Sequence, residues 1–310
     1  MDFGKVPREE IPEIDFSLPA DGAQTAATLN KSERVTTPKF YVGCAKWGRD
    51  EWIGQIYPKG TKAKDFLNQY VKQFNAIELN ASFYQIPTEK TVASWKASAE
   101  SYANPPFLFF PKFPRTVSHI HRLVNADTAT DTFLANLQGF GKFLGPVFLQ
   151  LSDNFGPAKL DVLESYLRNL PVDMRFFVEL RHREWFDDLT VRAKLFTLLH
   201  ELKIGSVLTD ATGRRDVLHM ELSTPAAFIR FVGNGQEFAF SDRDRVDSWV
   251  QRISTWLDKG LEDVYFFLHQ HDEKDTPEIA DYTIEQFNKH LGSKLNRVNF
   301  ITKQLGMFND

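Results

Sequence analysis

Residues 175–209 read RFFVELRHREWFDDLTVRAKLFTLLHELKIGSVLT, and this stretch holds one complete repeat of the predicted fold. An apolar, β-rich run at Arg175–Leu180 is followed by an amphipathic segment, Thr190–Leu202, that is long enough for a helix. A second β-rich run, Gly205–Thr209, comes directly after it. The order strand, helix, strand predicts two parallel strands joined by a helical crossover.

The same alternation continues on both sides of this repeat, from Phe40 onward. Eight strands are predicted, at Phe40–Cys44, Ala76–Leu79, Phe107–Lys112, Val147–Leu151, Arg175–Leu180, Gly205–Thr209, Ala227–Val232 and Val264–His269. Helices are predicted near Ala63–Phe74, Lys90–Ala99, Thr130–Phe143, Leu160–Asn169, Thr190–Leu202, Arg243–Leu257 and Pro277–Leu291, whereas the link Asp210–Pro225 is weakly helical. Eight parallel strands with helical returns close into a barrel without exposed edges. We therefore predict an α/β fold, a single (β/α)8 TIM barrel that tolerates one irregular unit.

An open, doubly wound sheet is the alternative fold. Such a sheet normally carries a glycine-rich turn for a nucleotide phosphate, and neither GxGxxG nor GxxxxGK[ST] occurs in the sequence. Residues 1–38 show no sustained helical or strand period and predict an irregular extension that wraps on the surface or is partly disordered. The barrel domain is expected to cover residues 39–300, followed by a tail at 301–310.

Composition argues against several classes of protein. The chain has 37 Lys and Arg against 41 Asp and Glu, and its net charge of -4 gives no general attraction for nucleic acid or anionic lipid. No apolar stretch approaches the ~20 residues of a membrane span, and no basic-then-apolar leader follows Met1, so we expect a cytoplasmic protein. Cys44 is the only cysteine, which rules out an intramolecular disulfide. A buried, inert thiol is favoured over a nucleophile.

Polar residues stand where the predicted strands end. A charge at the end of a strand in a parallel barrel is tolerated where it points into the solvated mouth. The two-residue period places Glu78 on one face with Asn80, and Glu179 with Arg181. The remaining strand ends carry Lys112, Gln150, Asp210, Arg230 and His269. We predict a charged pocket at the C-terminal ends of the strands, and a purely structural ion-pair network is the alternative.

Within this pocket the residue types indicate separate roles. Lys112, Arg181 and Arg230 are predicted to hold an anionic substrate. The predicted proton-moving residues are Glu78, Glu179, His182 and Asp210. The predicted substrate-binding set also includes Asn80, Tyr84, Gln150 and Trp47. Loop aromatics at Trp47, Trp52, Tyr57, Phe83, Tyr84 and Trp185 suit the apolar faces of sugars or unstacked bases, although packing under the barrel rim is equally compatible.

An ordered series of short motifs resembles the YecE-like family, a domain of unknown function also called DUF72. The series runs through Tyr41-Val42-Gly43 to Trp47, Trp52 to Tyr57-Pro58, Ile77-Glu78-Leu79-Asn80-Ala81-Ser82-Phe83-Tyr84, Ser118-His119, Leu144-Gly145-Pro146 and Val178-Glu179-Leu180-Arg181-His182. The resemblance implies a TIM barrel with a pocket around Glu78, Asn80, Tyr84, Lys112, Glu179, Arg181, His182 and Asp210. It implies no activity. The runs Cys44-Ala45-Lys46 and His269-Gln270-His271 depart from the family pattern and indicate a variant pocket.

The chemistry favoured by these residues is metal-independent acid–base catalysis, without a cofactor, on a small anionic or sugar-like molecule. A two-carboxylate glycosidase ranks low, because its acids commonly stand on strands four and seven rather than two and five. A metal-dependent phosphodiesterase or nucleic-acid-binding barrel would draw ligands from Glu78, Glu179, His182, Asp210, His269 and His271. A non-catalytic ligand-binding protein is the third class. The sequence leaves the reaction class and the oligomeric state open.

Overall fold

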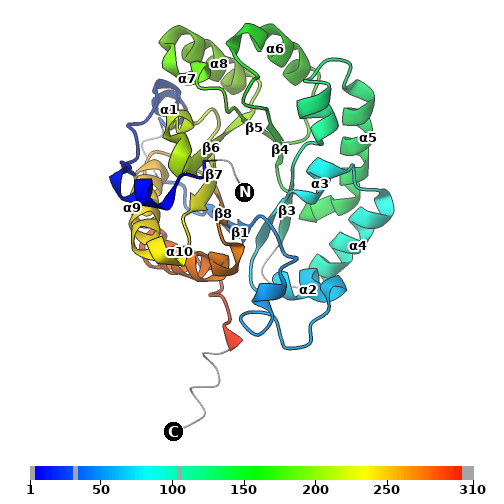
Figure 1. Cartoon of the computed structure of the whole chain (residues 1–310). Helices are drawn as coiled ribbons and strands as arrows, with labels where there is room; N and C mark the ends of the chain where they lie inside the picture. Colours follow the sequence, from blue (N-terminus) through cyan, green and yellow to red (C-terminus); the bar gives the residue numbers. More distant parts are fainter. Residues whose placement is uncertain (1–3, 31–33, 103–106, 302–310) are drawn as a thin grey trace.

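The computed structural model describes residues 4–30, 34–102 and 107–301. These residues form one eight-stranded parallel sheet in the order β3-β2-β1-β8-β7-β6-β5-β4. The sheet curls into a nearly closed barrel with helices outside it (Figure 1). The predicted TIM-barrel fold is confirmed. Residues 302–310, nearly all of the predicted tail, lie outside the described part of the chain.

Observed strand bounds agree with the predicted ones to within two residues. The strands are β1 Lys39–Cys44, β2 Ala76–Leu79, β3 Leu108–Pro111, β4 Val147–Gln150, β5 Phe176–Glu179, β6 Gly205–Ala211, β7 Ala226–Gly233 and β8 Asp263–Gln270. The α-helices are α1 Ala23–Thr28, α2 Phe66–Tyr70, α3 Ala81–Tyr84, α4 Glu89–Glu100, α5 Asp127–Leu137, α6 Leu160–Arg168, α7 Glu184–Asp187, α8 Leu189–Glu201, α9 Ala239–Leu257 and α10 Thr276–Leu291. No helix among the described residues has the length and apolar character that crossing a bilayer requires.

Aromatic side chains fill the interior of the barrel. The buried interior cluster contains Ala76, Phe110, Phe148, Phe177, Val207, Ala226, Phe228, Tyr265 and Phe267. The Phe228 ring centroid lies 5.1 Å from that of Phe267 and 5.2 Å from that of Phe148. This packing is the solid core expected of a TIM barrel rather than a pore. Inward-pointing polar groups at the C-terminal ends of the strands therefore lie between this core and the mouth.

The barrel closes weakly between β3 and β4. The two strands are joined by isolated bridges that pair Phe109 with Leu144 and Lys112 with Phe148, and by the Phe113 amide, which donates to the Phe148 carbonyl at 2.9 Å. Longer parallel ladders join the other neighbouring strands, as between β7 and β8. The side chain of Lys112 thus enters the barrel at its least regular seam.

The sixth βα unit is irregular, as predicted. The segment after β6 forms a 3-10 helix, Thr212–Val217, and no α-helix lies between β6 and β7 in the described chain. Instead, α1 of the N-terminal extension packs against α8, and Asp21, just before α1, forms a 2.7 Å ion pair with Arg252 of α9. In Figure 1, α1 lies between α8 and α9. The extension thereby covers the part of the barrel that this unit leaves open.

The expectation of an irregular extension is corrected for two segments. Arg8–Glu13 forms a 3-10 helix and Ala23–Thr28 an α-helix. Helices of six residues are too short to show an amphipathic period, so no periodic pattern in the sequence indicates them. Tertiary contacts hold the second one. Thr25 Oγ1 donates to the Met220 carbonyl at 2.8 Å and accepts from the Leu222 amide at 2.7 Å.

The Thr25 hydroxyl offers a test of this docking. Thr25→Val leaves the buried Leu222 amide without its acceptor, which we expect to cost about 1–3 kcal/mol of unfolding free energy. Thr25→Ser retains the hydroxyl and serves as the matched control. Urea denaturation followed by circular dichroism measures both variants, and equal midpoints for them would contradict the docking contact.

Candidate functional site

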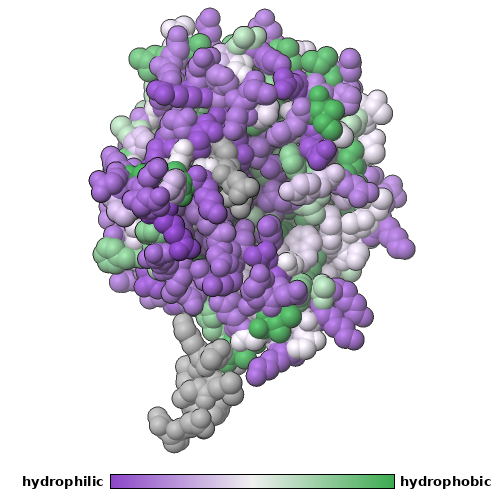
Figure 2. Space-filling model, in the orientation of Figure 1, coloured by the Kyte–Doolittle hydropathy of each residue, from purple (hydrophilic) through white to green (hydrophobic). Residues whose placement is uncertain are grey.

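A polar layer lies directly above the phenylalanine cluster. It contains Glu78, Lys112, Gln150, Glu179, Thr209, Arg230 and His269, all buried. Each member stands two positions beyond an interior residue of its own strand, as Lys112 does beyond Phe110, so the pleat directs it inward. The face drawn in Figures 1 and 2 is largely hydrophilic. The layer lies at the strand ends where the sequence predicts a charged pocket.

Arg230 of β7 joins two carboxylates across this layer. Its Nη2 and Nε donate to the two oxygens of Glu78 at 2.8 and 2.9 Å. Its Nη1 donates to both oxygens of Glu179, at 2.8 and 3.0 Å. All three side chains are fully buried. Because its donors are engaged in this way, Arg230 is placed as the counterion of both acids and not as the anion-binding group predicted from the sequence.

Further hydrogen bonds hold each acid. Glu78 accepts from Asn80 Nδ2 at 2.8 Å and lies 3.1 Å from His269 Nε2. Glu179 accepts from Arg181 Nε at 2.7 Å. These contacts bring together five strand-end residues that the sequence placed in one pocket. They also give His269 a defined position as a neighbour of the Glu78 carboxylate.

The arginines keep both acids ionised. Burial by itself would raise the pKa of Glu78, but Arg230 and His269 outweigh it and hold the pKa well below its usual range. Burial likewise opposes ionisation of Glu179, yet Arg181, Arg230 and Lys112 lower its pKa to about 2. Neither carboxyl carries a proton near neutral pH. Glu78 and Glu179 are thus poorly suited to the proton-moving role predicted for them.

Lys112 differs from the other cations of the layer. Its Nζ donates to Gln150 Oε1 at 2.5 Å, a neutral acceptor. The amine also lies 4.2 Å from the centroid of the Phe83 ring. Burial, followed by repulsion from Arg230, lowers the pKa of Lys112 to about 7. Its amine is therefore present in both the protonated and the neutral form at neutral pH.

An unusual loop places His119 against the Phe83 ring, which also contacts the Lys112 amine. The loop contains a π-helix, Thr116–Ile120, and positive φ angles at Arg122, Leu123 and Asn125. The His119 ring packs edge-on against Phe83 with centroids 5.1 Å apart. Burial and the charge of Lys112 lower the pKa of His119. Backbone of this kind is often retained at functional sites.

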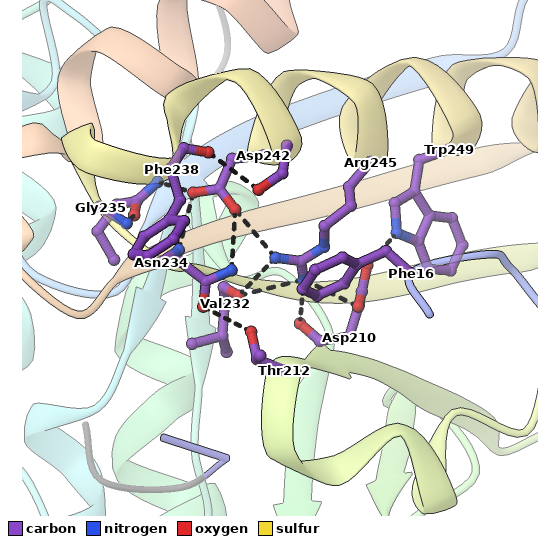
Figure 3. Close-up of polar contacts among 12 residues, drawn as sticks. Phe16, Asp210, Thr212, Val232, Asn234, Gly235, Phe238, Asp242, Arg245 and Trp249 are labelled. Carbon is purple, nitrogen blue, oxygen red and sulfur yellow. Dashed lines mark hydrogen bonds and ion pairs between the residues drawn. The ribbon is translucent and has the colours of Figure 1, made fainter. Parts of the chain in front are cut away.

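Asp210 does not belong to the mouth, and its predicted role is corrected. It faces the helices from the outer side of β6, in register with core residue Leu208. Its carboxylate accepts from Arg245 Nη2 at 2.9 Å and from Trp249 Nε1 at 2.8 Å, both on α9 (Figure 3). Phe16 of the extension covers Arg245, with the guanidinium 4.9 Å from the ring centroid. This second network fastens the extension and α9 to β6.

Other predicted residues lie at the rim or in the core. His182 packs against Gly156 in the loop after β4 and accepts from the Glu184 amide at 3.3 Å. Tyr84 is 74% exposed, and the half-buried Trp47 packs on Trp95. Among the described residues, no hydrogen bond, ion pair or ring contact joins these three to the polar layer. Predicted pocket aromatics that are instead fully buried are Trp52, Tyr57 and Trp185.

The structure bears on two further candidate functions, a cysteine nucleophile and a metal site. Burial raises the pKa of the Cys44 thiol well above its ordinary value, which favours the inert thiol predicted from the sequence. Among the described residues, no three His, Cys, Asp or Glu side chains form a group suited to a metal ion. Of the proposed metal ligands, Glu78 and His269 are in direct contact, whereas Asp210 lies on the opposite face of its strand.

Sequence reasoning missed two residues of the site. Thr209 faces the layer from β6, and its buried Oγ1 has no hydrogen-bond partner among the described residues. Thr209 lies opposite Arg230 in the register of β6 and β7. The sequence does not single it out, because both faces of β6 are buried and the strand shows no alternation of polar and apolar residues. The sequence places His119 only within the Ser118-His119 motif and assigns it no role in the pocket. The loop that turns it toward Phe83 has no sequence signature.

The buried bridge predicts a large effect on stability. Arg230→Met leaves two buried carboxylates without their shared counterion, and we expect a loss of about 3–5 kcal/mol in unfolding free energy. The triple variant Glu78→Gln, Glu179→Gln, Arg230→Met should recover most of this loss. Urea unfolding measures both. A loss below about 1 kcal/mol in the single variant would match a surface ion pair and contradict the assignment.

The Lys112 amine should titrate near neutrality. In protein labelled with ¹³C-lysine, we expect one Cε resonance to shift with a midpoint near pH 7, because Lys112 is protonated below about 7 and neutral above it. Exposed lysines titrate near 10.4. Lys112→Arg should remove this resonance and so assign it. A spectrum in which every lysine resonance titrates above pH 9 would refute the inferred environment.

Comparison with known proteins identifies the family. The chain is 26% identical over 287 residues to the UPF0759 protein YecE of Escherichia coli strain K12, which spans 87% of this chain and 100% of that protein. A DUF72 family protein from Enterococcus faecalis V583 shares the fold with a TM-score of 0.63 at 16% identity, over 84% of this chain and 98% of the other. One from Thermotoga maritima MSB8 gives 0.56 at 20% identity, over 82% and 100%. The family described as "Protein of unknown function DUF72" matches residues 41–299, and the chain belongs to this family.

Proposed function

We propose that the mouth of the barrel is an active site for metal-independent acid–base chemistry on a small anionic or sugar-like molecule, with Lys112 as the proton carrier. The observation that carries this proposal is the setting of the Lys112 amine. It is buried, paired with the neutral Gln150 oxygen at 2.5 Å, and has its pKa lowered to about 7 by burial and Arg230. A group whose pKa lies near the working pH is an efficient general acid or base.

The two acids have a supporting role in this mechanism. Glu78 and Glu179 remain ionised around Arg230, so they fix the charge and shape of the layer and do not exchange protons. A two-carboxylate glycosidase needs one acid that is protonated before the reaction. The lowered pKa values of both acids therefore argue against that mechanism and in favour of Lys112.

The surroundings of Lys112 favour an anionic or sugar-like substrate. Arg181 is largely buried beside Glu179, and its charge acts on both Lys112 and His119. A carboxylate or phosphate placed near these cations would be attracted by their combined charge. The half-buried Phe83 ring next to the amine offers a flat apolar surface of the kind that packs against sugar carbons.

Proton abstraction by Lys112 can be tested without knowing the full reaction. Chelator-treated protein is incubated in D₂O with small sugar phosphates, 2-oxo acids and hydroxy acids, and loss of substrate C–H signals is followed by proton NMR. We expect exchange of a carbon-bound proton in at least one compound, increasing as the pH rises through about 7 because the neutral amine is the base.

Lys112→Met should abolish this exchange. Lys194→Met, which changes an exposed lysine of α8, should leave it intact. Exchange that survives in Lys112→Met would overturn the assignment of the base. Exchange that vanishes on chelation and returns with a divalent cation would replace the proposal with metal-dependent chemistry.

A further inference from the structure

We propose, resting on the function proposed above, that the Lys112 amine forms a covalent imine with the carbonyl carbon of a small aldehyde or ketone that bears a carboxylate or phosphate. The inference comes from how the polar layer presents this amine. Lys112 is the one lysine among the described residues whose side chain enters the layer. Its neighbours allow the amine to act as a nucleophile. They also supply positive charges that would attract an anionic carbonyl compound.

The Lys112 environment makes the neutral amine available near neutral pH. Nζ is held by an amide oxygen at 2.5 Å instead of a carboxylate, and burial removes the amine from water, which disfavours its charged form. Positive charge on Arg230 and Arg181 repels a proton on the amine. A lysine that is desolvated next to other cations is a recognised form of activated amine nucleophile.

Thr209 provides an independent indication that a ligand belongs in the layer. Its side chain is 2% exposed and its Oγ1 has no hydrogen-bond partner among the described residues. The residue is opposite Arg230 in the strand register and two positions beyond the interior residue Val207. A buried hydroxyl without a partner costs free energy. An oxygen of a bound substrate would satisfy it.

The cations next to Lys112 select a charged carbonyl compound. The Arg181 side chain lies beside the layer at about a tenth of its full exposure, and the charges of Arg181 and Lys112 both act on His119. A carboxylate or phosphate near Arg181 would balance the charge of a protonated imine.

The covalent step is balanced without an oxidant or reductant. The lone pair of Nζ forms a bond to the carbonyl carbon, the C=O π electrons move to oxygen, and a proton passes from nitrogen to that oxygen. The resulting hydroxyl leaves as water after gaining a second proton, and the nitrogen lone pair forms the C=N bond. His119, half-buried at the Phe83 ring, is the titratable group placed to relay these protons from solvent.

Reductive trapping tests the imine directly. The full-length protein is incubated at pH 7 with sodium cyanoborohydride and either pyruvate, glyceraldehyde 3-phosphate or acetone, and modified peptides are mapped by mass spectrometry. We expect an adduct on Lys112 with at least one of the two anionic probes and little with uncharged acetone. At this pH its neutral fraction exceeds that of an exposed lysine by about a thousandfold, so Lys194 should remain unmodified at the same dose.

Variants separate the nucleophile from its surroundings. Lys112→Arg keeps a cation in the layer and should form no adduct at this position. Thr209→Val preserves shape and fold, and should lower the Lys112 adduct yield severalfold while leaving background labelling of surface lysines unchanged. Circular dichroism confirms that each variant is folded. Wild-type protein whose Lys112 is unmodified by all three probes overturns the imine.

The outcome is distinguishable from failure of the proposed function. If Lys112-dependent exchange occurs in D₂O but no probe is trapped, the amine acts as a base and the imine is wrong. If a Lys112 adduct forms without proton exchange, the imine stands and the acid–base function is wrong. If neither occurs, both proposals fall.

Discussion

The placement of one guanidinium constrains most of the barrel mouth. Arg230 extends from β7 into the barrel and contacts acids on β2 and β5, so three strands far apart in the sequence share one charge centre. Burying these charges is costly unless each is paired and hydrogen-bonded. The phenylalanine cluster below, with Phe228 two residues before Arg230 on the same face, leaves the mouth as the direction open to the polar layer.

This constraint divides the layer into two parts with different chemistry. Around Arg230, the carboxylates of Glu78 and Glu179 are held ionised and their hydrogen-bonding capacity is largely used. Around Lys112, at the weak seam between β3 and β4, the amine has a neutral acceptor and aromatic neighbours. The first part supplies rigidity, and the second supplies a group that changes protonation near neutral pH. The positive charge of Arg230 links the two, because it lowers the pKa of Lys112.

A second charge network on the outer side of β6 supports the same wall of the barrel. Asp210 binds Arg245 and Trp249 on α9 (Figure 3), and Arg215 connects Asp210 with the Phe16 and Ser17 carbonyls of the extension. The extension thus compensates for the missing helix of the sixth unit. Its contacts stabilise β6, which carries Thr209 on the inner face and Asp210 on the outer face.

The sequence by itself determined the eight strands, the barrel and the convergence of Glu78, Lys112, Glu179 and Arg230, because alternating apolar runs and strand-end charges are local patterns. It also pointed to the family. Only the tertiary structure decided which of these charges are paired. It showed Arg230 as a counterion, placed Asp210 on the helix side of β6, and brought His119 to Phe83. The physical reason is that pairing and pKa depend on distance and burial between strands, which a linear sequence does not encode locally.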